Sequence, residues 1–246
     1  MPSIYLSPSL QPFNKYLNGG NEQYYMNLIA DEMEPFLITN GITFERNELG
    51  SNLTRSIEES NNGNFDLHLA LHSNASPPTL KGILKGIDVY YRPDNYQAKN
   101  AAEIIADNLK NIYPSPSLVK AVPTTTLSEL NLVNAPSVLI ETGYHDNKDD
   151  VTWIKENTYA IASNIVESLT EFFDIPFISP PTPPRNGLVN ANNVNVRSKP
   201  STDSYVITKL NKDTPITILG QWENWYVINK DSITGYMYSD FVTPLN

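Results

Sequence analysis

The 246-residue sequence contains no cysteine and only three histidines. Without cysteine the chain forms no disulfide and offers no thiolate to a metal ion, so a metal site would have to use histidine, aspartate or glutamate. The formal net charge is -10, and the 17 basic residues form no block. We therefore expect no nucleic acid among the partners of this protein.

The sequence also lacks long apolar runs. No segment reaches the roughly 18 consecutive apolar residues of a membrane-spanning helix, which predicts no membrane partner. The start, "MPSIYLSPSL", has neither the positive charge nor the long apolar stretch of a signal peptide. We expect a soluble protein made without a secretion signal.

Proline is concentrated in one segment, "DIPFISPPTPPRNG", which covers residues 174 to 187. Such density favours an extended, semi-rigid spacer. The sequence therefore predicts a first domain over residues 1–175, a linker over 176–187 and a second domain over 188–246.

The first domain alternates short apolar runs with helical patterns. We expect strands in "SIYL", "FDLHLALH", "GIDVYY" and "PSVLIETGY", and helices over residues 21–41, 98–113 and 151–175. This alternation is typical of an α/β fold with a twisted, mostly parallel sheet flanked by helices. The second domain has only short β patterns, "VITKL", "TPITILG", "WYVIN" and "GYMYSDFV", which predict a small all-β barrel.

Two of the histidines lie in one predicted strand, "FDLHLALHSNAS". His68 and His72 would point to the same face about 13 Å apart, so they cannot bind one ion. Ligands of parallel α/β sheets bind beyond the carboxyl ends of the strands, which favours His72 at the strand end. For either histidine, a purely structural role is the alternative.

Two glutamates are the other candidates. Glu141 ends the apolar run "VLIE", and a carboxylate beside a metal-bound water can act as general base and then as general acid. Glu22 lies at the start of the first predicted helix, where a favourable interaction with the helix N-terminus is an ordinary alternative explanation.

Together, the segments "GGNE", "DLHLALHSNAS", "KGIDVYY" and "APSVLIETGYHDN" resemble the zinc-dependent N-acetylmuramoyl-L-alanine amidases of the third amidase family. The resemblance covers residues 3 to 175. It implies Zn²⁺ as cofactor, Glu22 and His72 as metal ligands, and Glu141 as the catalytic residue, with Asn74 and Asn147 in accompanying positions. The implied reaction cuts the amide between muramic acid and L-alanine in bacterial peptidoglycan.

The sequence departs from this family at one ligand. Family members carry another histidine just after the first strand, where this chain has "IYLSPSLQPFNKYLNGG", with Leu10 or Phe13 at the plausible positions. Gln11 and His145 are the alternatives for a third ligand, although a neutral amide is a poor zinc ligand. A rearranged site, weak metal binding and an inactive wall-binding relative all stay open.

The second domain resembles bacterial SH3-like domains through "VNVRSKPSTDSYVITKL" and "GYMYSDFV". Such domains commonly bind the cell wall. An aromatic face could serve this purpose, although at least half of its members are expected in the core: Trp222, Trp225, Tyr236 and Tyr238.

A catalytic module joined to a wall-binding module implies an endolysin-like protein. It would stay in the cytoplasm of the producing cell until lysis or non-classical release, and would then act at the cell wall. The alternatives are a non-catalytic peptidoglycan-binding protein and a zinc peptidase acting on the stem peptides.

Overall fold

The structure is a computed structural model that describes residues 1–178, 184–231 and 233–245. The chain divides into two compact units. One comprises Ser3–Met33 and Phe44–Phe172, and the other Phe173–Asn246 with Met1–Pro2 and Glu34–Thr43. Among the described residues, no helix has both the length and the apolar character needed to cross a bilayer.

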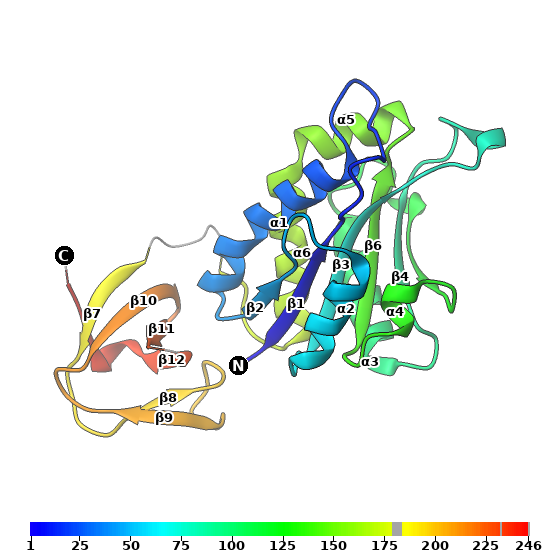
Figure 1. Ribbon diagram of the computed structural model, residues 1–246. Coiled ribbons are helices and arrows are strands. Elements are labelled where there is room, and N and C mark those ends of the chain that lie inside the picture. Colours follow the sequence, from blue (N-terminus) through cyan, green and yellow to red (C-terminus); the bar gives the residue numbers. More distant parts are fainter. Residues whose placement is uncertain (179–183, 232, 246) are drawn as a thin grey trace. The chain divides into compact units, whose positions relative to one another are not determined.

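The first unit is built on a six-stranded sheet in the order β2-β1-β3-β6-β4-β5 (Figure 1). Its strands are β1 (Ser3–Pro8), β2 (Thr43–Arg46), β3 (Leu67–Asn74), β4 (Ile87–Tyr91), β5 (Val119–Pro123) and β6 (Ser137–Tyr144). The pairs β1–β3, β3–β6 and β4–β5 are parallel, and β4 runs antiparallel to β6. The predicted mostly parallel sheet is confirmed.

Helices cover both faces of this sheet (Figure 1). The helices are α1 (Glu22–Thr39), α2 (Leu53–Asn62), α3 (Tyr96–Leu109), α4 (Ser128–Asn131), α5 (Lys148–Glu156) and α6 (Thr158–Phe172). Short 3-10 turns lie at Pro78–Leu80 and Pro116–Leu118. The three-layer arrangement buries a large apolar core, which fixes the strand ends that carry the polar candidates.

The two faces of the sheet differ in character. Leu67, Leu69 and Leu71 alternate along β3 and are fully buried on one face. Thr142 of β6 contacts Met26 of α1 at 3.7 Å on that face. The opposite face carries Ala70 and Leu139, which pack against Leu130 of α4. His68 and His72 share that second face, because side chains alternate along a strand.

Two helix ends illustrate how the sequence sets the elements. Helix α1 ends at Thr39, and Gly41 follows with a φ of 71°, a left-handed conformation that glycine adopts at little cost. The single helix predicted over 151–175 is wrong, because the chain forms α5 and α6 with a break at Asn157. Asn157 has φ −129° and ψ 22°, so it leaves the helical conformation between them.

The second unit contains a seven-stranded sheet in the order β13-β7-β10-β11-β12-β8-β9. Its strands are β7 (Arg185–Val189), β8 (Val194–Arg197), β9 (Val206–Leu210), β10 (Pro215–Trp222), β11 (Trp225–Lys230), β12 (Ile233–Tyr238) and β13 (Val242–Pro244), and a 3-10 turn covers Ser239–Phe241. Each neighbouring pair of strands in this order is antiparallel. The predicted all-β domain is confirmed.

The predicted linker over 176–187 lies partly outside the described residues, because 179–183 are not described. Strand β7 begins at Arg185, within the predicted linker.

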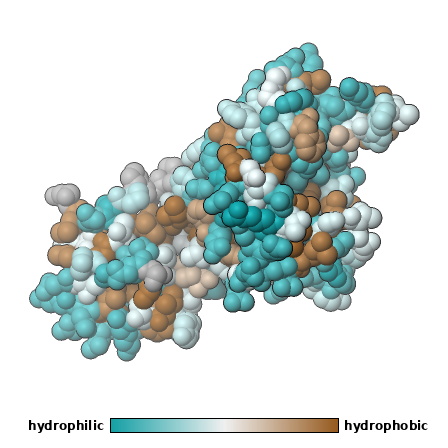
Figure 2. All heavy atoms as spheres, in the orientation of Figure 1, coloured by the Kyte–Doolittle hydropathy of each residue, from teal (hydrophilic) through white to brown (hydrophobic). Residues whose placement is uncertain are grey.

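On the visible face of the molecule, apolar side chains gather in separate patches among polar ones (Figure 2).

Candidate functional site

The candidate residues come together at the carboxyl ends of β3 and β6. His72 and Glu141 are register partners on these neighbouring parallel strands. Register partners point to the same face of a sheet, so the imidazole and the carboxylate leave the sheet together. Asp88 of β4 is the register partner of Glu141 on its other side. Three polar side chains therefore form a row across the strands.

Glu22 joins this row from a different element. It is the first residue of α1 and only 1% exposed, and its Oε1 lies 2.8 Å from Nδ1 of His72. Burial acts to raise the pKa of Glu22, but the hydrogen bond with His72 and the charge of that ring outweigh it, and the pKa lies below its usual value. The structure thus brings Glu22 and His72 into direct contact.

The ring of His72 is held from both sides. Burial acts to lower its pKa, yet the hydrogen bonds with Glu129 and Glu22 raise this pKa well above the ordinary histidine value. Each nitrogen of the ring therefore lies against a carboxylate, Nδ1 against Glu22 and Nε2 against Glu129.

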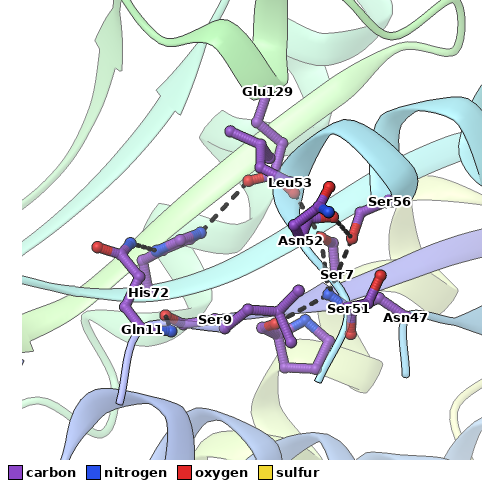
Figure 3. Close-up of a pocket in the computed structure, with 12 residues that line it drawn as sticks. Ser7, Ser9, Gln11, Asn47, Ser51, Asn52, Leu53, Ser56, His72 and Glu129 are labelled. Carbon is purple, nitrogen blue, oxygen red and sulfur yellow. Dashed lines mark hydrogen bonds and ion pairs between the residues drawn. The ribbon is translucent and has the colours of Figure 1, made fainter. Parts of the chain in front are cut away.

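Two amides of the loop after β1 complete the surroundings of Glu22. Gln11 Nε2 lies 3.3 Å from His72 Nδ1 (Figure 3), and Gln11 Oε1 accepts a hydrogen bond from Asn14 at 3.1 Å. Asn14 Nδ2 also donates to Glu22 Oε2 at 2.5 Å. From this loop, Gln11 is the side chain that makes a polar contact with His72.

Glu141 is the unsatisfied member of the group. Its Oε2 is buried and has no hydrogen-bond partner among the described atoms. Burial raises the pKa of Glu141 to about 7, and the Glu22, Asp88 and Glu129 carboxylates add to this effect against the opposing charge of His72. A carboxyl group with this pKa can gain and lose a proton near neutral pH, which suits general base and acid chemistry.

His145, one alternative for a third ligand, is engaged elsewhere. Its Nδ1 lies 3.0 Å from the Ser73 carbonyl oxygen and 3.2 Å from the Ser73 hydroxyl, and its ring stacks on Tyr16. Asn147 caps α5 by accepting from the Asp149 and Asp150 amides. Asn74 accepts a hydrogen bond from the Ala75 amide at 2.8 Å.

Sequence reasoning missed Glu129. This residue of α4 is 4% exposed, and its carboxylate contacts both His68 and His72. The available signal was a lone acidic residue between Leu127 and Leu130, in the segment that leads to the apolar strand β6. Such a carboxylate is buried only with partners, and two inward-facing histidines would supply them.

A cavity of about 360 Å³ adjoins the Glu129 side of His72 (Figure 3). It is lined mainly by neutral polar groups from β1, the loop after β1, the loop before α2, and α2: Ser7, Ser9, Gln11, Asn47, Ser51, Asn52 and Ser56. Leu10 and Leu53 supply apolar surface. His72 and Glu129 therefore border a pocket rich in hydroxyl and amide groups, whereas Glu22 and Glu141 are not among the residues that line it.

Several solved amidase structures share this fold. AmiC2 of Nostoc punctiforme matches with a TM-score of 0.62 at 17% identity, over 70% of this chain and 97% of that one. The catalytic domain of the CD27L endolysin targeting Clostridia Difficile matches with a TM-score of 0.59 at 23% identity, over 70% and 98%. Ami1 from Mycobacterium smegmatis gives 0.61 at 19% identity, over 70% and 97%. At these identities the likeness shows the fold.

The sequence itself identifies the family. Residues 14–171 match the N-acetylmuramoyl-L-alanine amidase family, and the chain belongs to that family. Residues 192–243 match the bacterial SH3 domain, so the expected identity of the second domain is confirmed. No curated protein matches the chain.

Proposed function

We propose that this protein is a peptidoglycan hydrolase that cleaves the amide between N-acetylmuramic acid and L-alanine. The family match supports the reaction. The observation that carries the proposal is the meeting of Glu22, His72 and Glu141 at one sheet edge, from segments far apart in the sequence. The peptidoglycan substrate follows from this assignment.

Glu22 and His72 fit a divalent cation such as Zn²⁺, although a catalytic zinc ion usually has three protein ligands. Within the described residues, no three histidine, aspartate or glutamate side chains form a ready metal cluster. His72 Nδ1 and Glu22 Oε1 are ordinary zinc donors that already lie 2.8 Å apart, and the partnerless Oε2 of Glu141 indicates a missing polar partner. We propose Glu22 and His72 as the ligands, with the Gln11 amide oxygen as a weaker third.

A zinc ion held there would polarise the scissile carbonyl and acidify a water molecule. Glu141 would take the proton from the attacking water and return it to the departing amine of L-alanine. Its pKa of about 7 in the metal-free protein would fall beside a cation, which favours the carboxylate that acts as base. Asn14 would hold Glu22 in place through its 2.5 Å hydrogen bond.

The second domain, proposed to cover residues 188–246, would bind the cell wall. A groove of about 500 Å³ lies on this unit, lined in part by Trp225, Tyr238 and Phe241. Tyr236 is fully buried and Trp225 is 8% exposed, so two of the four aromatic candidates belong mainly to the core. Through the proposed linker over 176–187, wall binding would raise the local concentration of the hydrolytic site.

Digestion of purified peptidoglycan tests the reaction. The zinc-loaded protein is expected to release stem peptides with a new N-terminal alanine and to leave the glycan strands intact. Glu141→Gln is expected to bind the wall normally and to release no peptide. New termini within the stem peptides would instead indicate a peptidase.

The absent family histidine favours a second candidate, a non-catalytic wall-binding protein. Zinc analysis separates the two functions. About one zinc per chain, lost in His72→Ala, supports the hydrolase. Wall binding with neither zinc nor released peptide supports the non-catalytic protein.

A further inference from the structure

Glu129 joins the two histidines of β3, and the reaction proposed above leaves it without a role. It lies on α4, over the sheet face that carries both rings. Its Oε1 is 3.1 Å from His68 Nε2, and its Oε2 is 3.3 Å from His72 Nε2. His68 is fully buried and lies on the side of Glu129 away from the proposed cation site.

The hydrogen bonds of this cluster fix which atom donates. The Ser7 hydroxyl donates to Oε1 of Glu129, and His68 contacts the same oxygen. The other nitrogen of His68, Nδ1, lies 2.9 Å from the Ser60 hydroxyl. With Oε1 occupied by two donors, Oε2 is the oxygen that accepts from His72.

This arrangement decides which nitrogen of His72 is available to a cation. A carboxylate only accepts, so a His72 ring that binds a cation through one nitrogen can donate to Glu22 or to Glu129, but not to both. Glu129 is also held by Ser7 and His68, whereas Glu22 is itself a proposed ligand. Nε2 is therefore the nitrogen that keeps its proton toward Glu129, and Nδ1, which faces Glu22 and Gln11, is the one whose lone pair can bind the cation. Figure 3 shows the His72 ring between Gln11 on one side and Glu129 on the other.

We propose that Glu129 is a positioning residue that holds His72 in the Nε2-protonated form and aims Nδ1 at the proposed metal site. The proposal rests on the proposed function, because it assigns Glu129 a role toward that cation. Carboxylates that hold the outer nitrogen of a ligating histidine typically contribute 10- to 100-fold to metal affinity. Ser7, Ser60 and His68 in turn hold Glu129.

The test is zinc affinity of the full-length chain, measured by competition with a chromophoric chelator. Glu129→Gln keeps an oxygen that can accept from Nε2 but removes the charge, and is expected to bind zinc about tenfold more weakly. Glu129→Leu removes both the acceptor oxygen and the charge, and its zinc affinity is expected to fall by up to about 100-fold. If the leucine variant does not fold, the glutamine variant alone decides.

Glu59→Gln is the matched control. Glu59 is a glutamate of α2 that accepts from Tyr5 at 2.8 Å and pairs with Arg55, away from His72. The same chemical change there is expected to leave zinc affinity unaltered. A merely structural role for Glu129 predicts lower stability in Glu129→Gln with zinc affinity equal to that of the unaltered protein, and this result would overturn the proposal.

A second readout is the protonation of His72 in the zinc-loaded protein. Nitrogen-15 NMR is expected to show the proton on Nε2, protected from solvent exchange, and to lose this protection in Glu129→Leu. A proton on Nδ1 would refute the proposal. An unaltered protein that binds no zinc would overturn the proposed function as well, whereas zinc binding that is indifferent to Glu129→Gln would overturn the positioning role alone.

Discussion

Replacing Glu141 by glutamine should stabilise the metal-free protein while removing its activity. Glu141 carries a buried oxygen without a partner, and its pKa is raised from 4.5 to about 7. The folded protein therefore favours the neutral carboxylic acid. Each unit of pKa difference corresponds to about 1.4 kcal/mol, so ionising Glu141 in the fold costs up to about 3 kcal/mol.

The pH dependence of this effect has a definite sign. Because the folded pKa lies above the unfolded one, the favourable contribution of the neutral acid is complete below about pH 4.5. It is lost as the pH rises through about 7. Glutamine stays neutral throughout. We therefore expect Glu141→Gln to match the unaltered protein near pH 4.5 and to exceed it by about 1 to 3 kcal/mol near pH 8.

Urea unfolding of the full chain with a chelator present measures this difference. Far-ultraviolet circular dichroism follows the amidase domain selectively, because the described α-helices lie within residues 22–172. Glu156→Gln, at an exposed position, serves as the control and should change the free energy of unfolding by less than about 0.5 kcal/mol. A stability difference for Glu141→Gln that is absent near pH 8, or that does not change with pH, would refute this reasoning.

The same variant is expected to lose activity by a factor of about 100 to 10,000, the usual contribution of a general base. Near pH 8, adding zinc should bring the free energy of unfolding of the unaltered protein closer to that of Glu141→Gln, because a nearby cation favours the Glu141 carboxylate. Retained hydrolysis in Glu141→Gln would assign the proton transfer to another group.

Three further changes follow from the geometry. Gln11→His should increase zinc affinity at least about tenfold in competition with a chelator, because an imidazole beside His72 Nδ1 is a better metal ligand than an amide. Unchanged affinity would place the cation elsewhere. Phe241 lines the groove and is 42% exposed, so Phe241→Ala should weaken binding to purified cell walls, measured by co-sedimentation. Tyr205 is 75% exposed and is not among the groove-lining residues, so Tyr205→Ala should leave wall binding unchanged. Asp150→Ala should lower the free energy of unfolding by about 2 to 4 kcal/mol in urea or thermal unfolding, because the Tyr113 hydroxyl and the Tyr144 and Gly86 amides lose their acceptor. A decrease under about 1 kcal/mol would show that water replaces the carboxylate as acceptor.

Much of the first domain could be predicted because its strands are strongly patterned. The run "LHLALHSN" forms β3 as Leu67–Asn74, and "SVLIETGY" forms β6 as Ser137–Tyr144. Since parallel strands end at one edge of the sheet, the alternation along these runs was enough to bring His72 and Glu141 together. The identity of Glu22 came from the family resemblance, because a glutamate at a helix start is common on electrostatic grounds alone.

Shorter elements were not predicted, for a physical reason. The helix α4 has only four residues, Ser128–Asn131, which is too short to show a helical period. A lone acidic residue between leucines was therefore the only mark of Glu129, and its partners are 61 and 57 positions away in the chain. The strand β2, Thr43–Arg46, is a half-exposed edge strand with few apolar residues to mark it. Only the tertiary fold specifies these contacts.

The break at Asn157 was missed because the apolar spacing continues across it. Val151 and Ile154 of α5 and Ile161 and Ile165 of α6 are all buried, so both helices present apolar residues to the core. Asparagine is a weak helix former, and its side chain bonds the Trp153 carbonyl at 2.8 Å. Periodicity alone does not distinguish one helix from two consecutive helices that cover the same sheet.

A crystal structure of the full chain soaked with zinc tests the central claim most directly. The expected result is anomalous density for one ion bound by Nδ1 of His72 and the carboxylate of Glu22, beside the Glu141 carboxylate on the neighbouring strand. Zinc bound at Nε2 of His72, or at another site with Glu22 and His72 still joined by their hydrogen bond, would contradict it.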